Sequence, residues 1–264
     1  MKISAIIITK NEESNIKRCL ESLQNVVDEV IVIDAFSTDK TEELCRSYDN
    51  LTFISRVWAG YGATKNYGNN IAQYPYILSL DADEVLSEKL GFEILKNKPI
   101  LRGSYIMPRL NHFGQKAIRF SGWYPDAKIR LFPKQGTYWS DDLVHERLVY
   151  KGEITTLSSD LLHFTYSSFE QYDNKMRKYA TLGARDMFLK ERNMSWRLML
   201  LKVFFKFFSI YILKLGIFDG VAGLKIAFES SKSIYWKYSD LHKLYNEIMI
   251  GGTLASYNIH SENK

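Results

Sequence analysis

Residues 76–84 read YILSLDADE, an apolar run that ends in three acidic residues. A short apolar run of this kind is typical of a strand that is buried on both faces of a sheet. Three similar runs precede it, at Ile3–Thr9, Glu29–Asp34 and Leu51–Ser55, and helical or helix-capping patterns lie between them. This alternation of strands and helices predicts right-handed crossovers and an α/β fold, with a mostly parallel sheet covered by helices on both faces.

Polar residues follow the carboxyl ends of three of these strands. The first run ends in residues 9–12 (TKNE), the second in Asp34 and the fourth in residues 81–84 (DADE). Ligands of open α/β sheets bind beyond these ends, so the three segments should form one site. Asp81 and Asp83 could face one Mg²⁺ or Mn²⁺, which also accepts phosphate oxygens.

Two further residues fit a bound nucleotide. Asp34 could accept hydrogen bonds from a base or from ribose hydroxyls, and Lys65 lies at the start of a predicted helix, where a phosphate is favoured. Each assignment has a structural alternative. Residues 81–83 (DAD) could form an acidic turn that caps the helix near Ser87. Asp34 could be a surface helix cap, and Lys65 could be a solvated side chain.

Four segments in order resemble the family 2 glycosyltransferases, which have a Rossmann-like GT-A fold. They are IIITKNEESNIKRCLESL (6–23), VIVIDAFSTDKT (30–41), WAGYGATKNYGNNIA (58–72) and ILSLDADE (77–84). RFSGWYPDAKIRLFPK (119–134), DLVHERL (142–148) and LLHFTYSS (161–168) are similar to the lipopolysaccharide-core glucosyltransferase branch, the WaaE/KdtX-like enzymes. One departure is Phe36, because the nucleotide loop of the family usually carries a glycine in a GSTD-like string.

The resemblance implies a role for each residue of the donor site. Asp83 would ligate a divalent metal, Mn²⁺ or Mg²⁺, and Asp81 would face both the metal and the ribose. The nucleotide-sugar, a UDP-sugar, would be held by Thr9, Asn11, Glu12, Asp34, Lys65 and Asp81.

The resemblance also implies inversion, in which a base deprotonates the acceptor hydroxyl. Glu146 is the first candidate, Asp142 the second and Asp126 the third, and each could instead be a surface carboxylate or a salt-bridge partner. His163 is either a core histidine or, as in related folds, a further metal ligand beside Asp83. Arg130 and Lys128 could contact the diphosphate or an anionic acceptor, or they could be solvated side chains.

The second half of the chain is basic and helical. Residues 171–264 hold 15 Lys+Arg against 8 Asp+Glu, a net charge of +7, whereas residues 1–170 carry −2. Residues 196–218 (WRLMLLKVFFKFFSIYILKLGIF) read as a basic amphipathic helix that lysines interrupt too often for a membrane span. The helix could pack on the catalytic domain, or it could make peripheral contact with an anionic membrane.

These features predict two domains. Residues 1–168 would form a GT-A catalytic domain, with a donor half (1–85) and an acceptor half (86–168), and residues 169–264 would form the helical region. Cys19 and Cys45 occupy apolar helical positions, which indicates buried free thiols and a reducing compartment. The N-terminus has no signal-peptide pattern, so we expect a cytoplasmic protein, at the cytoplasmic face of the inner membrane.

The predicted function is transfer of a sugar from a nucleotide-sugar to a saccharide or glycolipid acceptor of lipopolysaccharide or another cell-surface glycan. Transfer to a polyprenyl phosphate carrier would use the same donor site and stays open. A glycosidase fits poorly, because its carboxylates must lie about 5–9.5 Å apart across a sugar. The non-enzymatic alternative is a membrane-binding protein with a degenerate nucleotide fold. No nucleic-acid partner is expected, because the basic half lacks base-reading motifs.

Overall fold

The computed structural model describes residues 1–140 and 147–251, which form two compact units. The first unit comprises Met1–Arg119 and Trp123–Thr165. The second comprises Phe120–Gly122 and the chain from Tyr166 onward, so it includes three residues that come from within the first unit.

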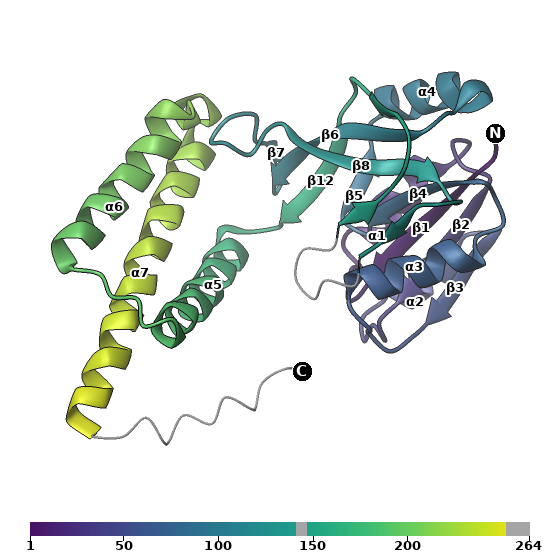
Figure 1. Ribbon diagram of the computed structural model, residues 1–264. Coiled ribbons are helices and arrows are strands. Elements are labelled where there is room, and N and C mark those ends of the chain that lie inside the picture. The colour runs from purple at the N-terminus through teal and green to yellow at the C-terminus, as the bar shows by residue number, and fades with distance from the viewer. Residues whose placement is uncertain (141–146, 252–264) are drawn as a thin grey trace. The chain divides into compact units, whose positions relative to one another are not determined.

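Four parallel strands form one half of the sheet in the first unit (Figure 1). They are β1 (Ile3–Thr9), β2 (Glu29–Asp34), β3 (Leu51–Ser55) and β4 (Tyr76–Asp81), and their bounds agree residue for residue with the prediction. β1 lies between β2 and β4, and β3 pairs with β2. Every residue of β1 is buried, as its continuous apolar sequence requires.

The strands that follow β4 make the sheet mixed. β8 (Asp126–Pro133) runs antiparallel to both β4 and β6 (Ser104–Phe113), and β5 (Glu84–Leu86) runs antiparallel to β12 (Leu161–Tyr166). The shorter strands are β7 (Lys116–Ala117), β9 (Tyr138–Trp139), β10 (Leu148–Val149) and β11 (Ile154–Thr156). The main sheet has the order β3-β2-β1-β4-β8-β6-β12-β5, with β7 and β11 paired to β6.

Helices cover both faces of the sheet, which confirms the predicted α/β class. α1 (Ile16–Leu23), α2 (Thr41–Arg46) and α4 (Glu88–Asn97) contribute to the same core cluster as alternate residues of β1. α3 (Tyr61–Ile71) packs on the opposite face, and a short 3₁₀ turn, η1 (Lys98–Ile100), follows α4. Both cysteines are buried and free, as predicted.

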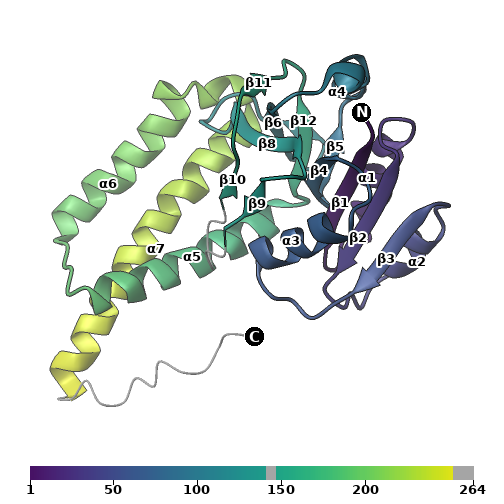
Figure 2. The ribbon, with the colours of Figure 1, turned by 45° about the vertical axis from the view of Figure 1, so that its right-hand side comes forward.

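The second unit is helical, as expected. α5 (Phe169–Leu189) and α6 (Trp196–Phe208) both pack on α7 (Val221–Gly251) (Figure 2). Ser168 and Ser195 cap α5 and α6 by accepting hydrogen bonds from the backbone N–H groups of Gln171 and Leu198.

The amphipathic helix expected over residues 196–218 is shorter than predicted. α6 ends at Phe208 and continues as a π-helical turn, η2 (Ser209–Leu213), and then as a 3₁₀ turn, η3 (Gly216–Asp219). Leu215 is left-handed, with φ of 56°, and a side chain at Gly216 would place Cβ only 2.7 Å from the Ile210 carbonyl oxygen. Within residues 1–140 and 147–251, none of the helices has the length and apolar character needed to cross a bilayer.

Candidate active site

The polar ends of β1, β2 and β4 lie side by side at one edge of the sheet. Thr9 is paired with Asp34, and its neighbour Ile8 is paired with Asp81. The three segments therefore meet as the sequence predicts. Thr9 and Asp34 are both buried, and the Thr9 hydroxyl has no hydrogen-bond partner within the described residues.

Asp34 organises the loop that follows β2. Its carboxylate accepts hydrogen bonds from the backbone N–H of Ser37, at 2.8 Å, and from the Ser37 hydroxyl. The hydroxyl accepts from the Asn11 backbone N–H at 2.8 Å, and the Asn11 side-chain oxygen accepts from the Thr38 backbone N–H at 2.8 Å. Phe36 has φ of 54° and a side chain that is 57% exposed, so the residue that replaces the expected glycine keeps a left-handed conformation.

Glu12 joins this loop to the acidic turn after β4. Its backbone N–H donates to the Thr41 hydroxyl at 2.9 Å, and its carboxylate accepts from Asn15 at 2.7 Å. Burial raises the pKa of Glu12, and the negative charges of Asp83 and Asp39 raise it further, against the effect of the Asn15 hydrogen bond. Glu12 therefore lies close enough to sense the charge of Asp83.

Asp81 belongs to a network of ion pairs. One carboxylate oxygen lies 3.2 Å from Lys65 Nζ, and the other accepts from Arg130 Nη2 at 2.8 Å. Arg130 and Arg109 also donate to the buried carboxylate of Glu84, at 2.6 and 2.9 Å. Burial alone would raise the pKa of Asp81, but the positive charges of Arg130 and Lys65 outweigh it and lower the pKa. Asp81 is thus an anion whose charge the protein itself balances.

Lys65 and Arg130 are buried, so neither is the solvated side chain considered as an alternative from the sequence. Lys65 is 2% exposed, and its ammonium lies 4.6 Å from the centre of the Trp139 ring as well as beside Asp81. Arg130 is 4% exposed. Contact of Lys65 with a phosphate stays a prediction.

His163 lies beside Asp83, with Nε2 3.2 Å from Oδ2. The other ring nitrogen, Nδ1, is 2.6 Å from the Asn111 side-chain oxygen, and the Asn111 amide nitrogen donates to the Trp123 carbonyl at 2.9 Å. Because that carbonyl only accepts, the amide orientation is fixed and Nδ1 carries the proton. Thr165 Oγ1, 2.9 Å from Nδ1 and 3.3 Å from the Asn111 oxygen, fits the same assignment.

With the proton on Nδ1, the side chains of His163 and Asp83 fit a divalent cation. In the neutral ring, Nε2 presents a lone pair to a carboxylate oxygen of Asp83, and two facing acceptors at 3.2 Å need a proton or a metal ion. Imidazole and carboxylate are both ligands of Mn²⁺. Within the described parts of the chain, no group of three or more His, Cys, Asp or Glu is placed to hold a metal. Phosphate oxygens and water would therefore have to complete the coordination.

The three candidate bases fall in different settings. Asp126 accepts from Arg109 Nε at 3.0 Å and lies 2.9 Å from Lys128 Nζ. Burial would raise the pKa of Asp126, but the Arg109 hydrogen bonds and charge lower it overall, which weakens this carboxylate as a base. Glu146 and Asp142 lie outside the described residues.

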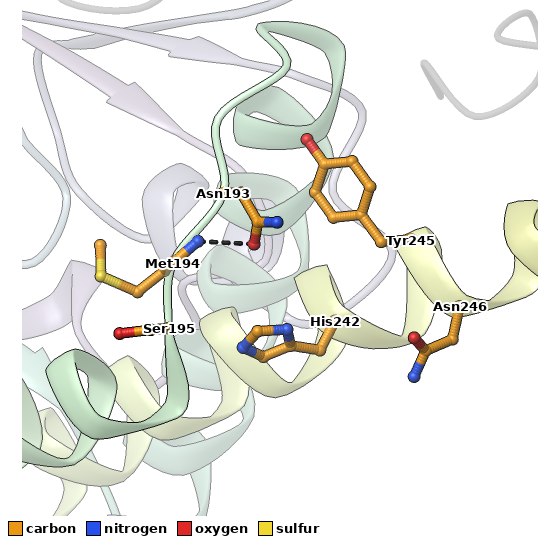
Figure 3. Close-up of a pocket in the computed structure, with 6 residues that line it drawn as sticks. All are labelled: Asn193, Met194, Ser195, His242, Tyr245 and Asn246. Atoms are coloured by element: carbon orange, nitrogen blue, oxygen red, sulfur yellow. Dashed lines mark hydrogen bonds between the residues drawn. The ribbon is translucent and has the colours of Figure 1, made fainter.

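A pocket of about 510 Å³ lies in the helical unit, between the segment that precedes α6 and the C-terminal part of α7 (Figure 3). It is lined by Asn193, Met194, Ser195, His242, Tyr245 and Asn246. None of the predicted site residues lines this pocket, and none of its lining residues is a carboxylate.

Sequence reasoning gave no role to Glu84, Arg109 or Asn111. Glu84 is fully buried and pairs with His163 in register, and the other two lie on β6. The sequence signal that could have identified them is a polar or charged residue within an otherwise apolar strand. A buried charge or amide needs hydrogen-bond partners, so such a residue indicates a polar network.

Ligands of open α/β sheets bind beyond the carboxyl ends of the strands, and here that edge carries a carboxylate–histidine pair and cations that are paired with carboxylates. Among solved structures, the crystal structure of residues 1–349 of S. aureus TarS is 16% identical, has a TM-score of 0.46 and matches 93% of this chain and 92% of that chain.

The family model described as "Glycosyl transferase family 2" matches residues 4–97. An uncharacterized glycosyltransferase of Rickettsia bellii is 32% identical over 200 residues, which cover 70% of this chain and 67% of that protein. The lipopolysaccharide core biosynthesis glycosyltransferase LpsC of Rhizobium meliloti is 29% identical over 198 residues, which cover 70% of this chain and 71% of LpsC. The chain belongs to glycosyltransferase family 2, which confirms the predicted membership and the enzyme class.

Proposed function

We propose that this enzyme transfers a sugar from a UDP-sugar to a saccharide acceptor of lipopolysaccharide or another cell-surface glycan, with a divalent metal, Mn²⁺ or Mg²⁺. The observation that carries the proposal is the geometry of His163, whose Nδ1 lies 2.6 Å from the Asn111 side-chain oxygen and whose Nε2 lies 3.2 Å from the Asp83 carboxylate. The metal would neutralise the charge that develops on the departing diphosphate.

The nucleotide would be held at the sheet edge by residues from three strand ends. Thr9 offers a buried hydroxyl without a partner in the described residues, which supports contact with a ligand. Asn11, Glu12 and Asp34 belong to the adjoining loops, which their hydrogen bonds order. Asp81 would lie beneath the diphosphate. Its ion pair with Lys65 would balance its negative charge, so that the site does not become too negative to bind the diphosphate.

The transfer would invert the anomeric centre. An acceptor hydroxyl loses its proton to a base and attacks the anomeric carbon opposite the diphosphate, whose bond to the sugar breaks as the new glycosidic bond forms. Glu146 is the first candidate for the base and Asp142 the second. Asp126 stays the third candidate, and its ion pairs, which lower its pKa, weaken it further as a base. The similarity to LpsC, at 29% identity, supports a lipopolysaccharide-core acceptor.

The proposed setting is the cytoplasmic face of the inner membrane. The two buried free thiols are typical of a reducing compartment. A glycolipid acceptor would be presented there at the membrane surface, so peripheral contact with anionic lipid would bring the enzyme to its substrate.

Calorimetric titration of UDP, with and without Mn²⁺, tests the donor site. We expect wild-type protein to bind UDP more tightly with the metal, and Asp83→Ala and His163→Ala to lose that difference. Asp49→Ala is the matched control, because Asp49 is an exposed carboxylate of the same unit and should bind as wild type does.

Two results would contradict the proposal. Metal-dependent binding that survives both substitutions would remove Asp83 and His163 from the metal site. Binding of GDP, CMP or TDP in place of UDP would reject uridine as the base but would leave the sheet edge as the proposed nucleotide site.

A further inference from the structure

We propose that the outer face of α6 binds the surface of an anionic phospholipid bilayer. This face consists of six apolar residues that are 38–70% exposed, namely Leu198, Leu200, Leu201, Phe204, Phe205 and Phe208. At about 100° per residue, they fall within an arc of about 160° around the helix. The face lies in the helical unit and includes no residue assigned to the donor site.

The opposite side of α6 is the side that packs on α7. Met199 is fully buried in a cluster with Tyr238 and Leu241, and Lys202 Nζ donates to the Tyr238 hydroxyl at 3.2 Å. Lys206 is half-buried, and burial together with the charges of Lys214 and Lys237 lowers its pKa.

Lys202 of the helix thus contacts its protein neighbour, and three of the four phenylalanines of the helix, Phe204, Phe205 and Phe208, are exposed. An amphipathic helix on a water-soluble protein has the reverse orientation, with its apolar stripe on the core. A contiguous exposed apolar surface marks a place where something binds.

Charge identifies the occupant as anionic lipid. From Arg192 to Phe218 the chain has no Asp or Glu and has five basic residues, Arg192, Arg197, Lys202, Lys206 and Lys214. Residues 166–251 hold 14 Lys+Arg against 8 Asp+Glu. A negative headgroup layer attracts such a segment, and Phe and Leu side chains insert at its interface. A second copy of this chain would instead bring two acid-free, basic segments together, which like-charge repulsion opposes.

The length of α6 makes it lie along the membrane and not across it. Its 13 residues extend about 20 Å, whereas the hydrocarbon core is about 30 Å thick. Ile217, Phe218 and Val221, which follow the helix along the chain, are also apolar and at least 50% exposed. Trp196, at the start of the helix, is 50% exposed and stacks on His242 with ring centres 4.6 Å apart.

Co-sedimentation of the full chain with lipid vesicles tests this assignment. Vesicles would contain phosphatidylcholine alone or with phosphatidylglycerol. We expect wild-type protein to bind the anionic vesicles, and to bind them less tightly at high salt. The double variant Phe204→Gln/Phe205→Gln should bind about tenfold or more weakly, because two rings no longer insert. Phe92→Gln is the matched control, because Phe92 is 76% exposed on α4 of the other unit.

Three outcomes would overturn the assignment. They are no vesicle binding by wild-type protein, equal binding by the double variant, or a dimer in sedimentation equilibrium that the double variant abolishes. The last would assign the face to a second copy. UDP titration on the same samples separates this inference from the proposed function, because vesicle binding needs no donor and the double variant should still bind UDP.

Discussion

At the scale of single residues, the proposed metal site depends on Asn111, a side chain that would not contact the substrate. Asn111 donates to the Trp123 carbonyl and accepts from His163, so a backbone group decides which imidazole nitrogen is free. The sequence pointed to His163 as either a core residue or a ligand. It is largely buried and fully hydrogen-bonded at Nδ1, as a core histidine would be, and this bonding is what leaves Nε2 available beside Asp83.

Removing the Asn111 amide should therefore weaken metal binding without removing a ligand. We expect Asn111→Leu to lower the affinity for Mn²⁺ in the presence of UDP about 10–100-fold, the usual cost of losing the partner of a ligating histidine. Electron paramagnetic resonance of free Mn²⁺ measures this directly.

Asn111→Asp keeps an acceptor for Nδ1 and should recover most of the affinity. Asn70→Leu, at an exposed position of α3, should leave it unchanged. Wild-type affinity in Asn111→Leu would mean that the tautomer is not set by this amide.

The contribution of Arg130 to the free energy of unfolding should depend on pH. Arg130 is shared by Asp81 and the buried Glu84, so Arg130→Gln should lower the free energy of unfolding at neutral pH by about 3–5 kcal/mol, the cost of breaking a buried ion pair. The lowered pKa of Asp81 adds stability that is present above its unfolded pKa and is lost as the pH falls through its folded pKa. The difference between wild type and variant should therefore narrow below about pH 4.

Urea unfolding followed by circular dichroism, at neutral and acidic pH, measures this difference. Arg46→Gln removes an exposed ion pair with Glu42 and should change stability by less than about 0.5 kcal/mol. A penalty in Arg130→Gln that stays the same in acid would count against the network.

At the scale of secondary-structure elements, the sequence was most informative where each segment decides its own structure. The bounds of β1, β2 and β4 could be predicted because a short, continuous apolar run suits a strand covered on both faces. β3 lies at the edge of the sheet, and its residues are half-exposed or exposed. The end of α6 could not be predicted, because Leu215 and Gly216 leave the helix through contacts with Ile210 and with η3. No periodicity within residues 196–218 encodes those contacts.

Close packing of α3 on β1 depends on a glycine. A Cβ at Gly68 would lie 2.3 Å from the Ile6 side chain in the core. We expect Gly68→Ala to lower the free energy of unfolding by about 1–3 kcal/mol, as overpacking does. Thermal denaturation would show this as a lower melting temperature.

Gly91→Ala is the matched control, because Cβ there would lie 3.4 Å from Val26 and the residue is also helical. It should raise stability by about 0.5–1 kcal/mol by reducing the entropy of the unfolded chain. Equal effects of the two substitutions would show that α3 can move away from β1.

At the scale of the whole molecule, the chain passes between its two units three times, at 119–120, 122–123 and 165–166. The sequence suggested one boundary near residue 168 and gave no sign that Phe120–Gly122 associates with distant helical residues. Asp219 accepts hydrogen bonds from this segment, although it is 98 residues from Ser121 and 99 from Phe120. Contacts over such separations leave no local pattern, so they are the part of the fold that a single sequence conceals.

Asp219 should control how tightly this short segment is held. Its buried carboxylate accepts from the Ser121 hydroxyl at 2.7 Å and from the Phe120 backbone N–H at 3.2 Å. Asp219→Ala leaves both donors without this acceptor, at a cost of about 1–3 kcal/mol, so trypsin should cleave after the neighbouring Arg119 about tenfold faster. Asp240→Ala removes another carboxylate of the helical unit, which forms an ion pair with Arg177 between α5 and α7, and should not change cleavage at Arg119. Equal cleavage rates in wild type and Asp219→Ala would mean that other contacts hold Phe120–Gly122, such as the hydrogen bond from the Ser121 backbone N–H to the Lys214 carbonyl and the contact of Phe120 with Phe218.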